Sequence, residues 1–270
     1  MIAPRALAGV ASAVLAACLL GPSALPVTGA GAATPATASQ AYGWGGAQEV
    51  WDWEQGQPIA PWTDWADGTG RVTNFVGMIA LDSGPMGAAS TGDVVSVLNA
   101  PGHSRGRWEF KVRAPQFGTL ATPYGMRVEL VPRGAAPGTC PSPTITVAAW
   151  TGYDAATTYG VHAGDTQWAG SIGLPRDRST WHTVAVEVTD DFIAWFADGQ
   201  VRGRLTRTQA PTAIPAVALV PRLVLDGEPG TTMTHTRFTA DWDRWYSLQR
   251  PDLKSVAAPA PLPADYAGEC

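Results

Sequence analysis

Residues 181–200 read WHTVAVEVTDDFIAWFADGQ, and this stretch decides the fold class. Valines alternate with smaller or polar residues over 184–188, a period of two that predicts a strand with one buried face. A second, aromatic-rich strand is predicted over 192–197 and a third over 200–205. Asp198-Gly199 lies between them and is a strong hairpin signal, because both central residues of such a turn need positive φ. The stretch therefore predicts an antiparallel meander.

The rest of the chain adds more short strands and no long helix. Of its 270 residues only 15% are charged, while Gly (30), Pro (23) and Trp (12) are abundant, a composition that suits many strands joined by turns. Residues 151–180 are expected to be loop-rich. Further strands are predicted over 72–81, 93–98, 107–112, 124–131, 144–150, 216–225 and 238–246. Together they predict one all-β domain, an antiparallel β-sandwich over residues 42–250.

Three end segments are set apart from this domain. Residues 1–33 fit a secretory signal peptide, with Arg5, an apolar run and a small-residue cleavage site. Residues 34–41 are expected to be a flexible leader, and residues 251–270 a Pro- and Ala-rich tail. These features predict a secreted protein. A lipoprotein anchored at Cys18 is the alternative, because the residues before that cysteine resemble a lipobox.

The charge of the sequence bears on its binding partners, and its cysteine content bears on disulfide formation. The sequence has 18 basic and 23 acidic residues, and no block of Lys or Arg stands out, so nucleic acid is not an expected partner. Cys140 and Cys270 remain after signal removal, an even pair in an oxidising compartment, which predicts a disulfide between them. We expect a monomer.

Several segments resemble glycoside hydrolase family 16. The Trp-His-Thr start, the Ile-x-Trp-Phe strand and the Asp-Gly turn of 181–200 resemble a late segment of that family. RWEFKV at 107–112 resembles an early strand, and DWDRWY at 241–246 resembles the terminal Asp-Trp-Val-Arg-Val-Tyr. The resemblance covers about 105–250. It implies the concanavalin A-like jelly roll, with a concave groove that takes a polysaccharide or another glycan.

The same resemblance locates the family's catalytic strand, and this strand lacks the catalytic residues. The family carries Glu-x-Asp-x-x-Glu after a strand that ends in Leu-Leu-Pro, and Leu130-Val131-Pro132 matches that ending. Thr144 then stands at the nucleophile, Thr146 at the central Asp and Ala149 at the acid/base. Retaining hydrolysis needs two carboxyl groups about 5–5.5 Å apart, so these positions cannot perform it.

Other residues are candidates for the groove. Glu129, on the preceding strand, is the candidate for a relocated catalytic acid, alone or with Arg127; alternatively the two form a solvated pair. Arg127, Glu129, Trp150 and Trp168 are the predicted sugar-binding residues, since an indole suits a pyranose face. Trp150 enters the groove if the bulge that relatives place in this strand is lost, and turns into the core if it is kept.

The tryptophan-rich stretch 42–70 has two interpretations. Trp51 and Trp53 would share one face of a strand. They either cover the sandwich or form a second sugar-stacking surface.

No cofactor is predicted. The four His residues have no metal-ligand spacing to one another or to Cys. The family resemblance implies at most a structural calcium on the convex side, for which Asp241 is the matching candidate.

Three functions remain open. The first is a secreted protein that binds a polysaccharide in the groove without hydrolysing it. The second is a β-glucanase-like glycosidase with relocated carboxylates, which requires a second carboxylate beside Glu129. The third is a structural or adhesive envelope domain without a sugar site, for which a groove filled by its own side chains would be the sign.

Overall fold

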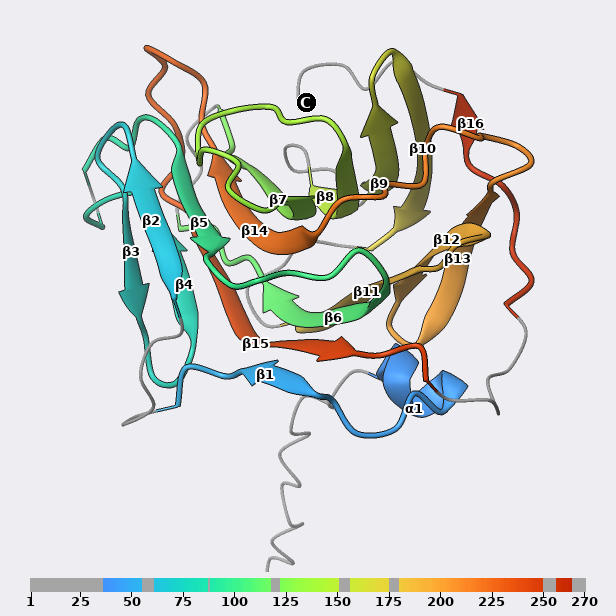
Figure 1. Cartoon of the computed structure of the whole chain (residues 1–270). Helices are drawn as coiled ribbons and strands as arrows, with labels where there is room; N and C mark the ends of the chain where they lie inside the picture. Colours follow the sequence, from blue (N-terminus) through green and yellow to red (C-terminus); the bar gives the residue numbers. More distant parts are fainter. Residues whose placement is uncertain are drawn as a thin grey trace, which may run out of the picture. The chain divides into compact units, whose positions relative to one another are not determined.

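The computed structural model describes residues 36–54, 61–86, 88–117, 122–150, 156–174, 180–249 and 256–263. The chain divides into two units, residues 1–33 and 34–270, and all described residues belong to the second. Within them, two antiparallel sheets form a β-sandwich, which confirms the predicted fold class (Figure 1). The expected signal peptide and Cys18 lie outside the described residues.

The first sheet, sheet A, contains the predicted meander at one edge. Its order is β13-β12-β11-β6-β15-β4-β3, and β1 pairs with the second half of β15. The bounds are β13 (Gln200–Thr206), β12 (Phe192–Ala197), β11 (His182–Val188), β6 (Gly106–Arg113), β15 (Arg237–Tyr246), β4 (Ile79–Asp82), β3 (Arg71–Asn74) and β1 (Glu49–Trp51).

The second sheet, sheet B, contains the predicted strand 144–150 as β8. Its order is β16-β10-β9-β8-β7-β14-β5-β2. The bounds are β16 (Leu262–Pro263), β10 (Thr166–Gly173), β9 (Ala156–Ala163), β8 (Thr144–Trp150), β7 (Gly125–Pro132), β14 (Leu219–Asp226), β5 (Val94–Leu98) and β2 (Trp62–Ala66).

The core lies between the inner faces of the two sheets. Alternate residues of each strand supply it, such as Val184, Val186 and Val188 of β11 and Met126 and Val128 of β7. Each apolar side chain buried in this way contributes about 1.5–3 kcal/mol relative to an exposed one. A period of two thus fixes, for each strand, which residues face the core and which face outward.

The hairpin between β12 and β13 forms as predicted. Asp198 and Gly199 have φ values of 47° and 71°, so both occupy the left-handed region that this turn requires. The carboxylate of Asp198 accepts a hydrogen bond from the backbone N–H of Thr183 at 2.9 Å. The turn therefore also ties the end of the meander to the start of β11.

Two strand predictions need correction. The strand predicted over 72–81 is two strands, β3 and β4, because the chain reverses between them at Gly77, where φ is 73°. The stretch 151–180 is not mainly loop: it contains β9 and β10, joined by a turn at Gly164 with φ of 62°. Its many Gly, Ala and Thr residues hid the alternation that larger apolar residues make visible.

The flexible leader is also wrong for its described part. Residues Ala38–Tyr42 form a helix, α1, capped at its start by the side chain of Thr37 and at its end by Gly43. The backbone N–H of Ala38 donates to Glu109 Oε1 at 2.5 Å, and Ala38 is buried on the outer face of sheet A. A buried carboxylate on β6 therefore holds this segment in place.

Part of the predicted tail is ordered as well. Val256 is buried beside α1, and β16 pairs with β10 at the edge of sheet B. Residues 250–255 and 264–270 lie outside the described residues.

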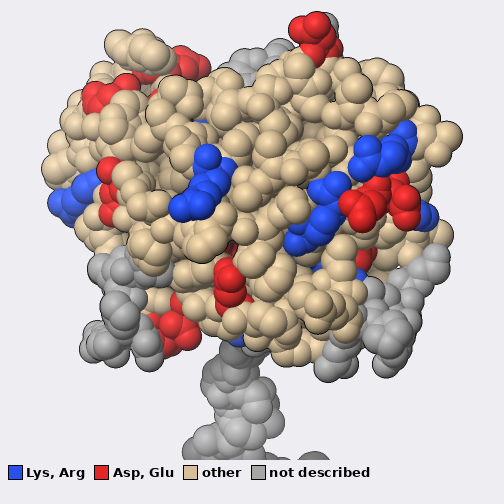
Figure 2. Space-filling model, viewed as in Figure 1, with Lys and Arg blue, Asp and Glu red and all other residues tan. Residues whose placement is uncertain are grey.

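Charged side chains are scattered over one face of the molecule. On the face drawn in Figure 2, Lys and Arg are separated by uncharged residues and by acids. That face is not the continuous basic surface that a nucleic-acid backbone favours. Within the described ranges, no helix is long and apolar enough to cross a membrane.

Candidate functional site

The backbone of β8 keeps a bulge. Thr146 lies opposite Gly160 of β9, and Ala149 lies opposite Thr158, so two residues of β8 face one residue of β9 between these pairs. The pairing of β8 with β7 also shifts by one residue here, because Val128 lies opposite Ala148 while Glu129 lies opposite Thr146. A bulge of this kind changes which side chains share a face of the sheet.

The bulge turns Thr144, Thr146 and Ala149 to the same side. The other residues of β8, Ile145, Val147, Ala148 and Trp150, belong to the core between the sheets. Thr144, Thr146 and Ala149 therefore point to the outer face of sheet B, where the resemblance places the family's acids. The strand β8, TITVAAW, brings no carboxyl group to this face.

Glu129 lies beside this strand in a buried ion-pair cluster. Its Oε1 is 2.9 Å from Nε of Arg127, and its Oε2 is 2.7 Å from Nε of Arg222. Glu129 and Arg222 are each 1% exposed, and Arg127 is 7% exposed. Both carboxylate oxygens of Glu129 are thus used by guanidinium groups, which corrects the idea of a solvated Arg127–Glu129 pair.

A second carboxylate joins this cluster. Asp226, at the end of β14, forms an ion pair with Arg127, with 2.8 Å between its Oδ2 and Nη1 of Arg127. Burial raises the pKa of Asp226, against the lowering effect of Arg127. Glu129 and Asp226 therefore meet at the guanidinium of Arg127, and Arg222 supplies the second positive charge of the cluster.

Arg222 and Asp226 could not be assigned to the site from the sequence. They lie more than ninety positions after Arg127 and Glu129, and only the pairing of β14 with β7 brings them together. One signal was visible: Arg222 is a lone charge in the apolar strand 216–225, and such a charge needs a buried partner.

The loop between β7 and β8 covers part of the outer face. The backbone oxygen of Thr139 accepts from Nη1 of Arg222 at 2.6 Å, and that of Pro141 accepts from the hydroxyl of Thr144 at 2.6 Å. A Cβ added at Gly138 would lie 3.2 Å from the ring of Trp65, so the loop also packs on β2. Figure 1 shows this loop arching over sheet B. It also carries Cys140; the predicted disulfide stays a prediction, because Cys270 lies outside the described residues.

Trp150 and Trp168, the two predicted sugar-binding tryptophans, do not lie on the outer face of sheet B. Trp150 is 3% exposed, lies in the core, and donates from Nε1 to the backbone oxygen of Leu174 at 3.2 Å. The kept bulge turns it inward. Trp168 of β10 is half-buried and packs against the same core, because it lies opposite Val161 on the inner face. Neither indole offers a ring face to a sugar in a groove.

The tryptophans near the N-terminus cover the sandwich. Trp53 is 4% exposed and packs against Trp62, with 5.5 Å between the ring centroids. Trp51 pairs with Asp243 on β15, while Trp53 leaves the strand with φ of 50°. This arrangement matches the covering interpretation of the stretch 42–70.

An accessible strip remains on the outer face of β9 and β10. Thr158 and His162 of β9 lie opposite Ser171 and Gln167 of β10, so the four side chains share this face. Ser171 is exposed and the other three are half-buried. The strands β8, β9 and β10 contain no Asp or Glu, so the strip is polar without acids.

Asp241 does not fit a calcium site. Its Oδ2 is 2.8 Å from the ammonium of Lys111, which would compete with a cation for the same oxygen. Among the described residues, no group of three His, Cys, Asp or Glu side chains could hold a metal ion.

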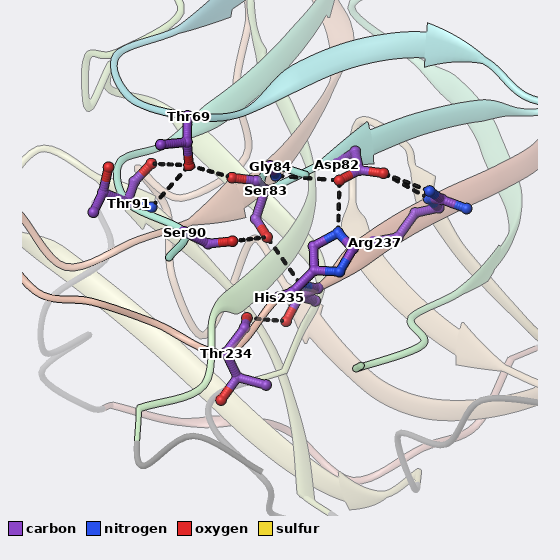
Figure 3. A network of polar contacts seen from close by, with 10 residues as sticks. Thr69, Asp82, Ser83, Gly84, Ser90, Thr91, Thr234, His235 and Arg237 are labelled. Carbon is purple, nitrogen blue, oxygen red and sulfur yellow. Dashed lines mark hydrogen bonds and ion pairs between the residues drawn. The ribbon is translucent and has the colours of Figure 1, made fainter. Parts of the chain in front are cut away.

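A second polar cluster lies on sheet A, as Figure 3 shows. Asp82 accepts from His235 at 2.8 Å and from Nη2 of Arg237 at 2.6 Å. The hydroxyl of Ser83 accepts from the backbone N–H of Thr236 at 2.9 Å. These contacts join the end of β4 to the start of β15. The sequence hid the Asp82–His235 pair, because 153 positions separate its members.

No family model matches the chain, and no curated protein matches it. Solved structures do. The laminarinase catalytic domain from Thermotoga maritima matches with a TM-score of 0.55 and 15% identity, over 76% of this chain and 99% of that one. LamAcat from Zobellia galactanivorans gives 0.58 and 12%, over 76% and 99%. The Bacillus licheniformis β-glucanase gives 0.54 and 17%, over 75% and 99%. At these identities the likeness shows the fold alone: this chain has the β-sandwich of family 16 glucanases.

Proposed function

We propose that this protein is an exported glycan-binding relative of the glucanases that does not hydrolyse its ligand. The observation that carries the proposal is the strand β8. Its bulge presents Thr144, Thr146 and Ala149 on the outer face of sheet B, where the family resemblance places three acids. Thr without a base is a poor nucleophile, and Ala has no proton to give.

The nearby acids do not replace the missing ones. Glu129 is held by Arg127 and Arg222, and Asp226 by Arg127. A general acid has to reach the leaving oxygen, and a nucleophile has to reach the anomeric carbon. Glu129 is buried at 1% exposure, and both Glu129 and Asp226 are engaged in ion pairs with guanidinium groups, so neither is free for these roles.

The strip on β9 and β10 is the surface on which a neutral polysaccharide would lie. Its side chains Thr158, His162, Gln167 and Ser171 are hydroxyl, imidazole and amide groups that can bond to sugar hydroxyls. Without a stacking tryptophan, we expect weak binding, with Kd values from about 0.1 to 1 mM.

Affinity electrophoresis and calorimetry with laminarin, lichenan and mixed-linkage glucan test the proposal. The protein should bind at least one of them, and reducing sugar should not accumulate. Ser171→Arg places a long charged side chain on the strip and should weaken binding at least fivefold. Gln200→Arg is the matched control, because Gln200 is exposed on β13 of the other sheet. Sugar release that disappears in Glu129→Gln would instead establish a glycosidase with relocated carboxylates.

One observation favours a second candidate, the structural or adhesive domain. The β7–β14 part of the outer face is filled by the Glu129 cluster and by the loop that carries Thr139. If none of a broad glycan array binds and Ser171→Arg changes nothing, this candidate replaces the first.

A further inference from the structure

The outer face of sheet A has two parts that differ in what lies on them. Over β11 and β12, the helix α1 and Trp44 cover the face and pack with Ala185 and Phe196. Over β3, β4, β15 and the end of β6, charged side chains occupy the same face. Figure 1 shows α1 on the side of the sheet away from β3 and β4. The second part is therefore a polar surface apart from the helix.

Strand pairing places three arginines together on this part. Arg71 of β3 and Arg237 of β15 both lie opposite Asp82 of β4. Arg113 of β6 pairs with β15 two positions after Arg237. Phe238, the neighbour of Arg237, belongs to the core, so Arg237 and its cross-strand partners point outward. Asp82 and Arg237 form an ion pair at 2.6 Å, as Figure 3 shows.

The other two arginines have no acidic partner. Lys111, a further cation on β6, forms an ion pair with Asp241 at 2.8 Å. Within the described part of the chain, no carboxylate lies at ion-pair distance from the guanidinium of Arg71 or Arg113. Four cations and two acids thus give an excess of two positive charges, on a protein with a formal net charge of −5. We call this set the basic face: Arg71, Asp82, Lys111, Arg113, Arg237 and Asp241.

The cations of the basic face lie close enough to affect one another. Burial lowers the pKa of Arg113, Asp241 raises it, and the charge of Arg237 lowers it further. The guanidinium of Arg113 is therefore within electrostatic reach of a second arginine. An anion bound between them would reduce this repulsion.

Two aromatic rings lie beside these cations. The centroid of the Trp181 ring is 4.5 Å from the guanidinium of Arg113 and 5.0 Å from the ammonium of Lys111. The ring of Phe75, which is 40% exposed, lies 4.6 Å from the guanidinium of Arg237. Trp181 precedes β11 and Phe75 follows β3, and four strand spacings, about 19 Å, separate these two strands. Flat rings and cations therefore alternate across an extended surface.

We propose that the basic face binds an acidic polysaccharide whose sugar units carry carboxylate groups. The planar fork of Arg71 and of Arg113 matches a carboxylate with two parallel hydrogen bonds. The rings of Phe75 and Trp181 suit the apolar faces of sugar rings, which a lipid headgroup or a nucleic-acid duplex does not offer. The basic face lies on the opposite sheet from the strip on β9 and β10. It is a second binding surface and does not depend on the proposed function.

Calorimetry with alginate, a polymer of uronic acids, tests the proposal at low ionic strength. Wild type should bind alginate, and binding should weaken as salt is added. Arg113→Glu should weaken binding about tenfold, because it replaces a carboxylate partner by a like charge. Arg133→Glu is the matched control: it makes the same change of charge at an exposed residue of the β7–β8 loop. Absence of binding, or equal losses in the two variants, would overturn the proposal.

A second variant separates loss of the site from loss of folding. Arg71 is exposed at the start of β3, so Arg71→Glu should keep the melting temperature of wild type. It should nevertheless weaken alginate binding, since Arg71 is the other arginine without an acidic partner. If alginate binding falls only in variants whose melting temperature falls, the basic face is not the binding surface.

Competing ligands then identify the partner. Excess laminarin should not displace alginate, because a neutral glycan would lie on the other sheet; displacement would place alginate on the strip and refute the second surface. Phosphatidylglycerol vesicles and a DNA duplex should bind more weakly than alginate. Tighter binding of either one, lost in Arg113→Glu, would overturn the assignment to a polysaccharide. If laminarin does not bind at all, the proposed function fails while the alginate result stands.

Discussion

Two buried acids, one on each sheet, have opposite surroundings. Glu129 on the outer face of sheet B accepts from two arginines, whereas Asp243 of β15 lies opposite Trp51 and Phe110. Neither oxygen of Asp243 makes a hydrogen bond of standard geometry to the described residues. Burial, and then the charge of Glu49, raises the pKa of Asp243 well above its usual value. Burial of a carboxylate alone therefore identifies neither a functional site nor a stabilising ion pair. The groups that contact the carboxylate decide whether its burial stabilises the fold.

Removing Glu129 should have the largest effect. Glu129→Ala leaves Arg222 as an uncompensated charge at 1% exposure, and should lower the unfolding free energy by about 3–5 kcal/mol. Urea denaturation at pH 7 measures it. The double variant Glu129→Ala/Arg222→Met removes both charges and should recover part of the loss. If the double variant is as unstable as the sum of the two single ones, the pair is not coupled and the comparison fails.

Asp82 resembles Glu129, because its buried carboxylate also accepts hydrogen bonds from side chains, those of His235 and Arg237. Burial would raise its pKa, but hydrogen bonds from His235 and Arg237 outweigh burial and lower it. The stability from this shift is present above the ordinary value of 3.8 and is lost as pH falls through the lowered pKa. Asp82→Asn should therefore destabilise by about 1.5–3 kcal/mol at pH 7 and by less at pH 3. Thermal melts at both pH values test this; a constant difference would contradict it.

The contribution of Asp243 to stability should change with pH in the opposite direction to that of Asp82. Its raised pKa means that the folded state holds the proton, so stability falls as pH rises above 3.8 toward the raised value. Asp243→Asn keeps the shape without the ionisation. At pH 7 the substitution should raise the unfolding free energy by about 1.4 kcal/mol for each unit by which the pKa of Asp243 lies above 3.8, counted up to pH 7. The melting temperatures of the two proteins should converge at pH 4. A less stable variant at pH 7 would show that the carboxylate has a partner.

The pair of Asp241 and Lys111 should have the smallest effect. Their side chains are 31% and 18% exposed, so Asp241→Asn should change the unfolding free energy by less than about 1 kcal/mol. Millimolar calcium should leave the melting temperature of both proteins unchanged. A calcium-dependent rise that Asp241→Asn abolishes would restore the calcium prediction.

The sequence predicted these features unevenly. A period of two and the Asp-Gly turn gave the meander, because local alternation and local turn geometry decide both. The absence of acids on β8 was readable for the same reason, once Leu130-Val131-Pro132 set the register. The Glu129 cluster was not readable, since Arg222 and Asp226 arrive from a distant strand. Trp150 depended on a single extra residue in the pairing, which no side-chain pattern on β8 reveals.

That extra residue separates two properties of the face that usually change together. The pairing of β8 with β7 and β9 decides which positions look outward, and the side chains at those positions decide what the face can do. Here the first is kept while the second is neutral. Thr144→Glu, Thr146→Asp and Ala149→Glu would consequently change the chemical character of the surface through side chains alone, with every strand left in register. Three substitutions would therefore make β8 an acidic strand, and its backbone pairing would not have to change.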